Sequence, residues 1–367
     1  MKRIAITHAE GATLGRSVQD GSGSVLVKAG TLLSPRYVKA LERRGFTEVF
    51  VTDAVAGEID VEDALRDETR GRAYSAVQAA FAEMRMEETE AVEAARSAVD
   101  EILDDLMSAD QNLICLSALR ASTEYTFIHS INVCALSLLI GLAQGLDRGD
   151  LRRLGLGALL HDVGMADCAD LATKPGALTT AEWERIRQHP ATGFNLLRSR
   201  PGVHLYSAHI AFQHHERLDG SGYPRGLRED RIIPFAKVVA VADAYDAMVA
   251  ERPYRPALPA HAAVAELLSG VGSQFDAAIV HKLSRRLATY PNGTVVRLST
   301  GELAAVAGQG IRPASPVVRV VSDARMNPVA PADVPLETDS QHRRIAELLA
   351  DWPAAFTLRV RELAGAH

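Results

Sequence analysis

The strongest constraint on the fold is a set of histidines and aspartates that interrupt apolar, helix-forming segments between residues 114 and 290. An ionisable side chain inside an apolar helix is costly to bury unless it finds a partner. We therefore expect a helical bundle whose facing helices share one polar cavity. Loops rich in glycine and proline separate six helix patterns, which run through 123–143, 147–161, 180–197, 203–213, 234–249 and 274–288.

The adjacent pair His161-Asp162 is the most informative of these residues, because it follows the apolar run LGLGALL at the end of a helix pattern. A buried histidine and aspartate at that point need partners, and a metal ion satisfies both. The pattern equally fits a histidine at the helix C-terminus beside an aspartate in a turn. Imidazole together with carboxylate is a ligand set for zinc, iron or manganese.

Similar residues recur on other helices, and each has a simpler alternative. His129 lies inside an apolar helix pattern, where a core histidine fits as well, and Asp243 and Asp246 lie inside another, where a cap or an arginine contact would satisfy a carboxylate. His189 precedes a proline, where a polar helix end fits as well. His214-His215 closes a further helix, where two surface histidines fit as well. Taken together, metal-type ligands on several helices favour one shared site.

The segments around this helical region have different characters. Residues 1–60 predict a strand-helix-strand module in which Ser34-Pro35 caps and starts the helix. Residues 61–113 predict a long helical segment whose partial apolar stripe either dimerises the chain or packs within it. Residues 291–367 switch to short strands, followed by a proline-rich loop and a final helix over 341–349.

Composition limits the partners and the compartment. The formal net charge is −6 and no dense run of Lys or Arg occurs, which argues against binding to polymeric nucleic acid. The longest apolar stretch, Val133–Ala143, is too short to span a bilayer, so no membrane association is expected. Three cysteines form no disulfide framework and the N-terminus lacks the apolar core of a signal peptide, which predicts a cytoplasmic protein.

The order of the motifs is similar to that of the HD-GYP phosphodiesterase family over about residues 114–290. The resemblance implies a mainly α chain: an HD-type helical bundle flanked by a small α+β N-terminal module, a helical linker at 61–113 and a short-stranded C-terminal extension at 291–367. The matching strings are TFIHSINV around His129, HDVG at 161–164, TKPGALT at 173–179, WERIRQHPATG at 183–193, HHERLDGSGYPRGL at 214–227, IPFAKVVAVADAYDAM at 233–248 and ERPYRPA at 251–257.

The resemblance also implies a site and an activity. The family hydrolyses cyclic di-GMP to linear pGpG, to GMP or to both, with two divalent metal ions, here iron or manganese first and zinc or nickel as further candidates. Two cations about 3.5–4 Å apart can clamp a phosphodiester and produce hydroxide near neutral pH. The catalytic residues would be His161, Asp162 and Asp243. One ion would be held by His129, His161, Asp162 and Asp243, and the other by His189, His214 and His215, with Asp162 bridging.

Substrate contacts are implied as well. Arg252 and Arg255 match positions that face the phosphates, for which a forked guanidinium is suited. Gly222 and Tyr223 belong to the GYP loop that shapes the pocket, and Tyr223 would contact a guanine or the sugar-phosphate.

The sequence departs from the family pattern at two positions. Met165 stands where members usually carry a lysine, which supplies positive charge near the reacting phosphate; the thioether offers none. Tyr125 stands where some members have a glutamate for a third metal, which favours two metals here. The alternative function is therefore a weak or inactive module that binds cyclic di-GMP or a partner protein.

Overall fold

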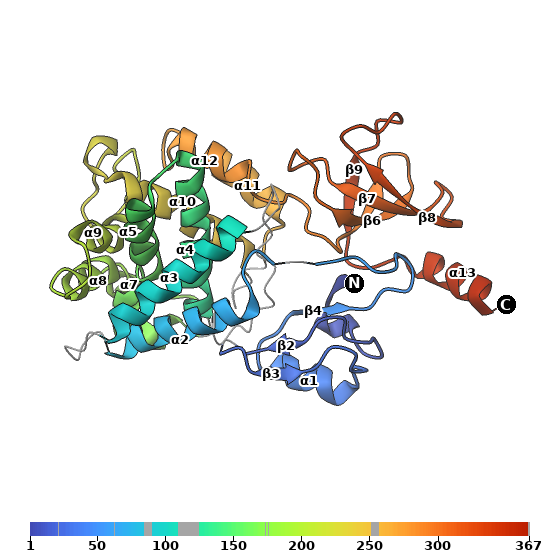
Figure 1. Ribbon diagram of the computed structural model, residues 1–367, viewed down its shortest axis with the longest axis horizontal. Helices are drawn as coiled ribbons and strands as arrows, with labels where there is room; N and C mark the ends of the chain where they lie inside the picture. The colour runs from blue at the N-terminus through green and yellow to red at the C-terminus, as the bar shows by residue number, and fades with distance from the viewer. Residues whose placement is uncertain are drawn as a thin grey trace.

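The computed structural model describes residues 1–20, 22–61, 63–83, 90–108, 125–172, 174, 176–250 and 257–365. A body of helices occupies one side of the molecule, and the N-terminal module and a C-terminal sheet lie on the other (Figure 1). This arrangement agrees with the mainly α fold class predicted from the sequence.

The N-terminal module consists of short strands around one helix. Strands β1 (Lys2–Ala5) and β4 (Glu48–Val51) pair antiparallel, as do β2 (Val18–Gln19) and β3 (Val25–Val27), and a 3₁₀ turn η1 spans Ile6–His8. Helix α1 (Pro35–Arg43) starts as predicted, because the Ser34 side chain accepts a hydrogen bond from the Tyr37 N–H at 3.4 Å. Strand β1 was not predicted from the sequence.

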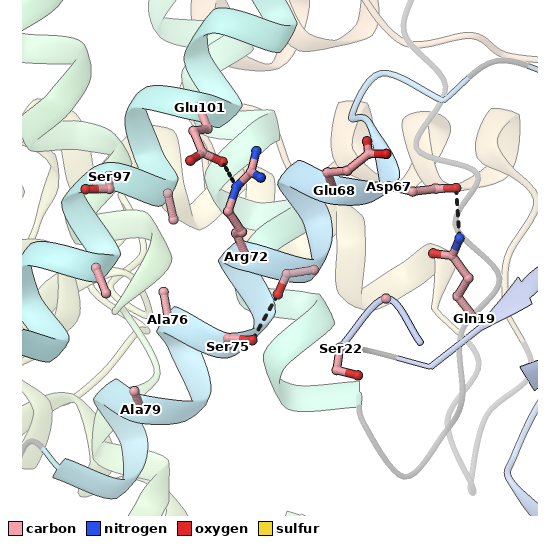
Figure 2. Close-up of a pocket in the computed structure, with 14 residues that line it drawn as sticks. Gln19, Ser22, Asp67, Glu68, Arg72, Ser75, Ala76, Ala79, Ser97 and Glu101 are labelled. Carbon is pink, nitrogen blue, oxygen red and sulfur yellow. Dashed lines mark hydrogen bonds and ion pairs between the residues drawn. The ribbon is translucent and has the colours of Figure 1, made fainter. Parts of the chain in front are cut away.

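The segment predicted as one long helical linker is two helices, α2 (Asp67–Glu83) and α3 (Glu90–Ser108), which pack against each other. Their apolar stripe is buried inside the chain, since Val77, Val99 and Ile102 belong to the same core as the helices that follow. The N-terminal module meets the first turn of α2, where Asp67 accepts hydrogen bonds from Arg16 at 2.8 Å and Gln19 at 3.3 Å. Figure 2 shows Gln19 turned toward Asp67 at the edge of a groove of about 640 Å³ along α2 and α3.

The helical body surrounds α4, which packs against α2, α3, α5, α10 and α12. Helices α4, α5, α9, α10 and α12 match predicted segments, whereas α11 was not predicted. The remaining elements are α4 (Tyr125–Gln144), α5 (Arg148–Leu159), η3 (Val163–Cys168), α6 (Ala169–Ala172), α7 (Thr180–Ile186), α8 (His189–Leu197), α9 (Leu205–Gln213), η4 (Glu229–Arg231), α10 (Pro234–Val249), α11 (Ala260–Ser269) and α12 (Ala277–Ser284).

One predicted helix, 180–197, is divided into α7 and α8. Pro190 lies in the first turn of α8, where its missing N–H costs nothing, but the same residue cannot continue α7. The cap of α7 is Thr179: its side chain accepts from the Glu182 N–H, and the Glu182 carboxylate accepts from the Thr179 N–H. This capping box fixes where α7 begins.

Most of helix α4 is strongly apolar: Thr126–Gln144, a 19-residue stretch with mean hydropathy 1.8, is long and apolar enough to cross a membrane. Within the molecule, 78% of its apolar window is buried against the surrounding helices. Central core helices of globular proteins share this character. The helix is therefore explained by its place at the centre of the bundle.

The C-terminal region forms a five-stranded antiparallel sheet in the order β8-β7-β6-β5-β9, followed by helix α13 (Ala354–Gly365). Two predictions were wrong here. The expected helix over 341–349 contains a strand, because residues 345–349 pair with β5, and the expected proline-rich loop contains an edge strand. The strands are β5 (Val295–Leu298), β6 (Leu303–Gly308), β7 (Val317–Ser322), β8 (Pro328–Pro335) and β9 (Ile345–Leu349).

Candidate metal centre

Five segments of the helical body bring the seven predicted ligand residues to one place. His129 comes from the second turn of α4, whereas His161-Asp162 follows the end of α5. His189 is the first residue of α8, His214-His215 follows the last residue of α9, and Asp243 lies in α10. Because α9 ends at Gln213, the backbone turns there, and the rings of the two adjacent histidines lie 4.1 Å apart between centroids, tilted at 43° to each other.

The seven side chains fall into two groups, in each of which the potential ligand atoms lie within 4.8 Å of one another. The first group joins three helices: His129 Nε2 lies 3.1 Å from Asp243 Oδ1, and the rings of His129 and His161 are 5.4 Å apart. These are three of the four residues that the family resemblance implies for the first ion, the fourth being Asp162. The group consists of His129, His161 and Asp243.

The second group is centred on the Asp162 carboxylate. Asp162 Oδ1 lies 3.2 Å from His189 Nε2 and 3.6 Å from His214 Nε2, while Asp162 Oδ2 lies 3.5 Å from His161 Nε2 in the first group. Asp162 therefore faces both groups at once. The second group consists of Asp162, His189, His214 and His215.

Hydrogen bonds orient three of the imidazoles in the same way. The Nδ1 atoms of His161, His189 and His214 contact backbone carbonyls of the preceding turn at 2.7 to 2.9 Å. A carbonyl oxygen only accepts, so each Nδ1 carries the proton and each Nε2 keeps its lone pair. A histidine held in this way by an outer partner is the form that binds a metal.

The fit to a metal shows most clearly at His161, whose side chain is fully buried. Its Nε2 atom has no hydrogen-bond partner among the described residues, although a buried imidazole nitrogen without a partner is costly. A bound cation would give this nitrogen the partner that it lacks among the described residues. The residues present thus suit a divalent metal with nitrogen and oxygen ligands.

The ionisation states also favour a cation. Burial lowers the pKa of His161 to about 4, so this ring is neutral at physiological pH. Burial alone would raise the pKa of Asp162, but the imidazoles of His161, His189 and His214 around the carboxylate hold it well below its usual range. Asp243 behaves similarly: burial would raise its pKa, and the neighbouring imidazoles, His129 first among them, outweigh that effect. A neutral imidazole at His161 beside two ionised carboxylates is in the protonation state that metal binding requires.

Comparison with known proteins agrees with this geometry. A model of the HD domain family matches residues 105–279. A cyclic di-GMP phosphodiesterase of Pseudomonas aeruginosa, PA4108, is 35% identical over 289 residues, which cover 76% of this chain and 69% of that protein. The chain belongs to the HD-GYP family. The family resemblance stated from the motifs is thereby confirmed.

Other family members match over shorter stretches. A cyclic di-GMP phosphodiesterase of Thermotoga maritima is 39% identical across 45% of this chain and 46% of its own length. The 3'3'-cGAMP-specific phosphodiesterase 3 of Vibrio cholerae is 36% identical across 47% of this chain and 37% of its own length. The solved structure of Bd1817, a HDG"Y"P protein from Bdellovibrio bacteriovorus, is 17% identical with a TM-score of 0.49, covering 77% of this chain and 97% of that one.

In this HD-GYP chain, two glycines are required by close backbone approaches. A Cβ on Gly164 would lie 2.1 Å from the His189 carbonyl oxygen, so only glycine lets the turn after Asp162 pack on the start of α8. A Cβ on Gly222 would lie 2.5 Å from the His215 carbonyl oxygen. Gly222 thereby lets the GYP loop close over the second group, and the Tyr223 ring stacks on His215 at 4.7 Å. Burial raises the pKa of the Tyr223 hydroxyl, which stays a neutral donor.

Glu216 holds the GYP loop in place, a role that the sequence did not reveal. Its buried carboxylate accepts hydrogen bonds from the backbone N–H groups of Arg225 and Leu227, both at 2.8 Å. Arg225 follows Tyr223-Pro224 directly, and Leu227 lies two residues further along the chain. The carboxylate therefore ties the loop that carries Tyr223 back to the end of α9.

Removing this tie should destabilise the fold. Glu216→Ala leaves two inward-facing N–H groups without their acceptor, so we expect the free energy of unfolding to fall by about 2–4 kcal/mol. Glu216→Gln, which keeps one acceptor oxygen, should lose less. Urea unfolding of metal-free protein measures both, with Glu184→Ala at an exposed position as the control. Equal stability of Glu216→Ala and the control would contradict the assignment.

The remaining predicted site residues differ in how far the structure describes them. Met165 is half-buried in η3, and its N–H donates to the Asp162 carbonyl at 2.8 Å. Arg252 and Arg255 lie outside the described residues. Asp246, which the sequence identified only as a second interior carboxylate of α10, hydrogen bonds to His129.

Proposed function

We propose that this protein hydrolyses a phosphodiester bond of cyclic di-GMP to give linear pGpG, GMP or both, using two divalent metal ions. His129, His161 and Asp243 would hold one ion and His189, His214 and His215 the other, with Asp162 between them. The observation that carries the proposal is the convergence of these seven side chains, from five segments, on two adjacent ligand groups. Membership of a family with curated cyclic di-GMP phosphodiesterases supports the substrate.

When bound, the ions would supply a hydroxide near neutral pH and offset charge on the phosphate oxygens. The residues of the chain would hold the ions in place and bind the substrate. Asp162 and Asp243 bring negative charge that sets the spacing of the two positions, and Tyr223 offers its ring and a neutral hydroxyl to a base or sugar. We assign Arg252 and Arg255 to the substrate phosphates on the family resemblance. Histidine and carboxylate ligands suit iron or manganese, and also zinc or nickel.

A second function is favoured by one observation, the apolar Met165 beside Asp162. A protein without the usual cation would bind cyclic di-GMP, or a partner protein, and signal with little turnover. The two functions differ in a single measurable quantity, the rate at which metal-replete protein consumes the dinucleotide.

The test is elemental analysis combined with a product assay on freshly purified protein. We expect close to two equivalents of metal, and conversion of cyclic di-GMP that stops after dialysis against chelator and returns on adding metal back. 3'3'-cGAMP is the matched substrate, because a relative specific for it is 36% identical. Faster turnover of 3'3'-cGAMP would overturn the substrate assignment, and binding without turnover would establish the second function.

Assembly and location stay predictions. We place the protein in the cytoplasm, without membrane or polymeric nucleic acid as a partner, and as a homodimer. The apolar stripe of α2 and α3 that suggested dimerisation is used inside the chain, so a dimer needs another surface. Light scattering at high protein concentration measures the mass directly.

A further inference from the structure

A chain of buried polar side chains leads away from the proposed metal site to the first turn of α2. His129 Nδ1 lies 2.8 Å from Asp246 Oδ2, and Asp246 Oδ1 accepts from Asn132 Nδ2 at 3.0 Å. Asn132 Oδ1 accepts from Arg70 Nη1 at 3.2 Å, and Arg70 Nη2 donates to Asp63 Oδ1 at 2.6 Å. None of these side chains is more than 14% exposed.

The direction of every hydrogen bond in this chain follows from Arg70. A guanidinium only donates, so the Asn132 atom facing it must be the oxygen, and the Asn132 amide NH₂ must face Asp246. The Asp246 carboxylate accepts from that NH₂ on one oxygen and from the imidazole on the other. His129 therefore carries its proton on Nδ1, and its Nε2 lone pair points toward Asp243 and the first ligand group.

His129 differs from His161, His189 and His214 in how it is oriented. Those three rings bond to a carbonyl of their own preceding turn, at or next to a helix end. His129 lies in the second turn of α4, where the backbone carbonyls serve the helix itself, and its Nδ1 partner comes from α10. Of these four rings in the described structure, His129 is the one whose Nδ1 is bonded to a side chain of another helix.

We propose that Arg70 is a positioning residue for the metal centre: through Asn132 and Asp246 it fixes the tautomer and ring orientation of His129. The proposal rests on the metal site of the proposed function. It assigns a role in metal affinity to the helix that precedes the HD domain proper, since Arg70 lies outside the residues matched by the family model. Outer partners of metal-binding histidines typically contribute 10–100-fold in metal affinity.

The test compares metal affinity in three full-length variants. Arg70→Lys keeps a positive charge for Asp63 but loses the fork that also reaches Asn132, and Asn132→Ala removes the amide link. Both should lose one metal to a chelator at a concentration about 10–100-fold lower than wild type does, while the other metal stays bound. Arg72→Ala, an exposed arginine on the same helix that pairs with Glu101, should match wild type.

Further measurements separate positioning from simple stability. Because Arg70 acts through Asn132, the double variant should lose no more affinity than the stronger single variant. A purely structural role would lower the melting temperature of metal-free protein and leave the chelator concentration unchanged; that result overturns the proposal, as does additive loss in the double variant. His129→Ala is the reference variant. If it retains both metals, the proposed metal site is wrong. If His129→Ala loses a metal while Arg70→Lys and Asn132→Ala keep wild-type metal affinity, only the positioning role is wrong.

Discussion

Replacing Asp162 with alanine is expected to leave purified protein short of at least one metal equivalent and to lower turnover by on the order of 10³-fold or more. The Asp162 carboxylate lies within 3.6 Å of imidazole nitrogens in both groups: His161 on one side, and His189 and His214 on the other. Its loss removes the negative charge that two cations would share. It also leaves three buried imidazole nitrogens facing an enlarged, uncharged space.

The loss should be specific to this carboxylate. Asp230→Ala, at a side chain that is 79% exposed, is the matched control and should retain metal and activity. Elemental analysis and a product assay are run on both variants, with circular dichroism to verify folding. A folded Asp162→Ala protein that keeps two equivalents of metal would refute the bridging assignment.

The candidate site was more predictable from the sequence than the fold around it. Each predicted ligand residue is marked by chemistry that apolar helices rarely tolerate, such as the His161-Asp162 pair after LGLGALL, and the motifs give their order. The structure brings all seven together. The residues that orient His129 could not be recognised from the sequence in this way. Asn132 is an ordinary polar residue in α4, and its partner Arg70 lies more than sixty positions away in the sequence.

The errors in the fold have a common physical cause, which is that tertiary pairing overrides local preference. Residues 345–349 (IAELL) suit a helix, but their backbone groups pair with β5 at the sheet edge. Strand β8 contains three prolines, which an interior strand does not accept and an edge strand does. Helix periodicity indicates that a segment can form a helix, but it does not reveal whether that segment pairs with a neighbouring strand in the folded protein.

Replacing Met165 with lysine is expected to raise turnover of cyclic di-GMP by about 10²–10³-fold with unchanged metal content, by analogy with the contribution of one charged or polar group that stabilises a transition state. The Met165 N–H bonds to the Asp162 carbonyl, an i to i+3 contact of a 3₁₀ turn. In such a turn the side chains at i and i+3 eclipse one another. A lysine at 165 would therefore lie on the same side of the backbone as the Asp162 side chain, which faces the two ligand groups.

Two controls isolate the effect of the charge. Met165→Leu keeps an apolar side chain of similar size and should behave as wild type, and Met107→Lys places the same charge on an exposed position of α3. Initial rates at saturating and at low substrate separate turnover from binding. A wild type that binds without turnover, beside an active Met165→Lys, identifies the native protein as a binding module whose metal site is intact. Equal rates in the two proteins would mean that this chain offsets the missing ammonium with another cation, and the arginines at 252 and 255 are then the next residues to replace.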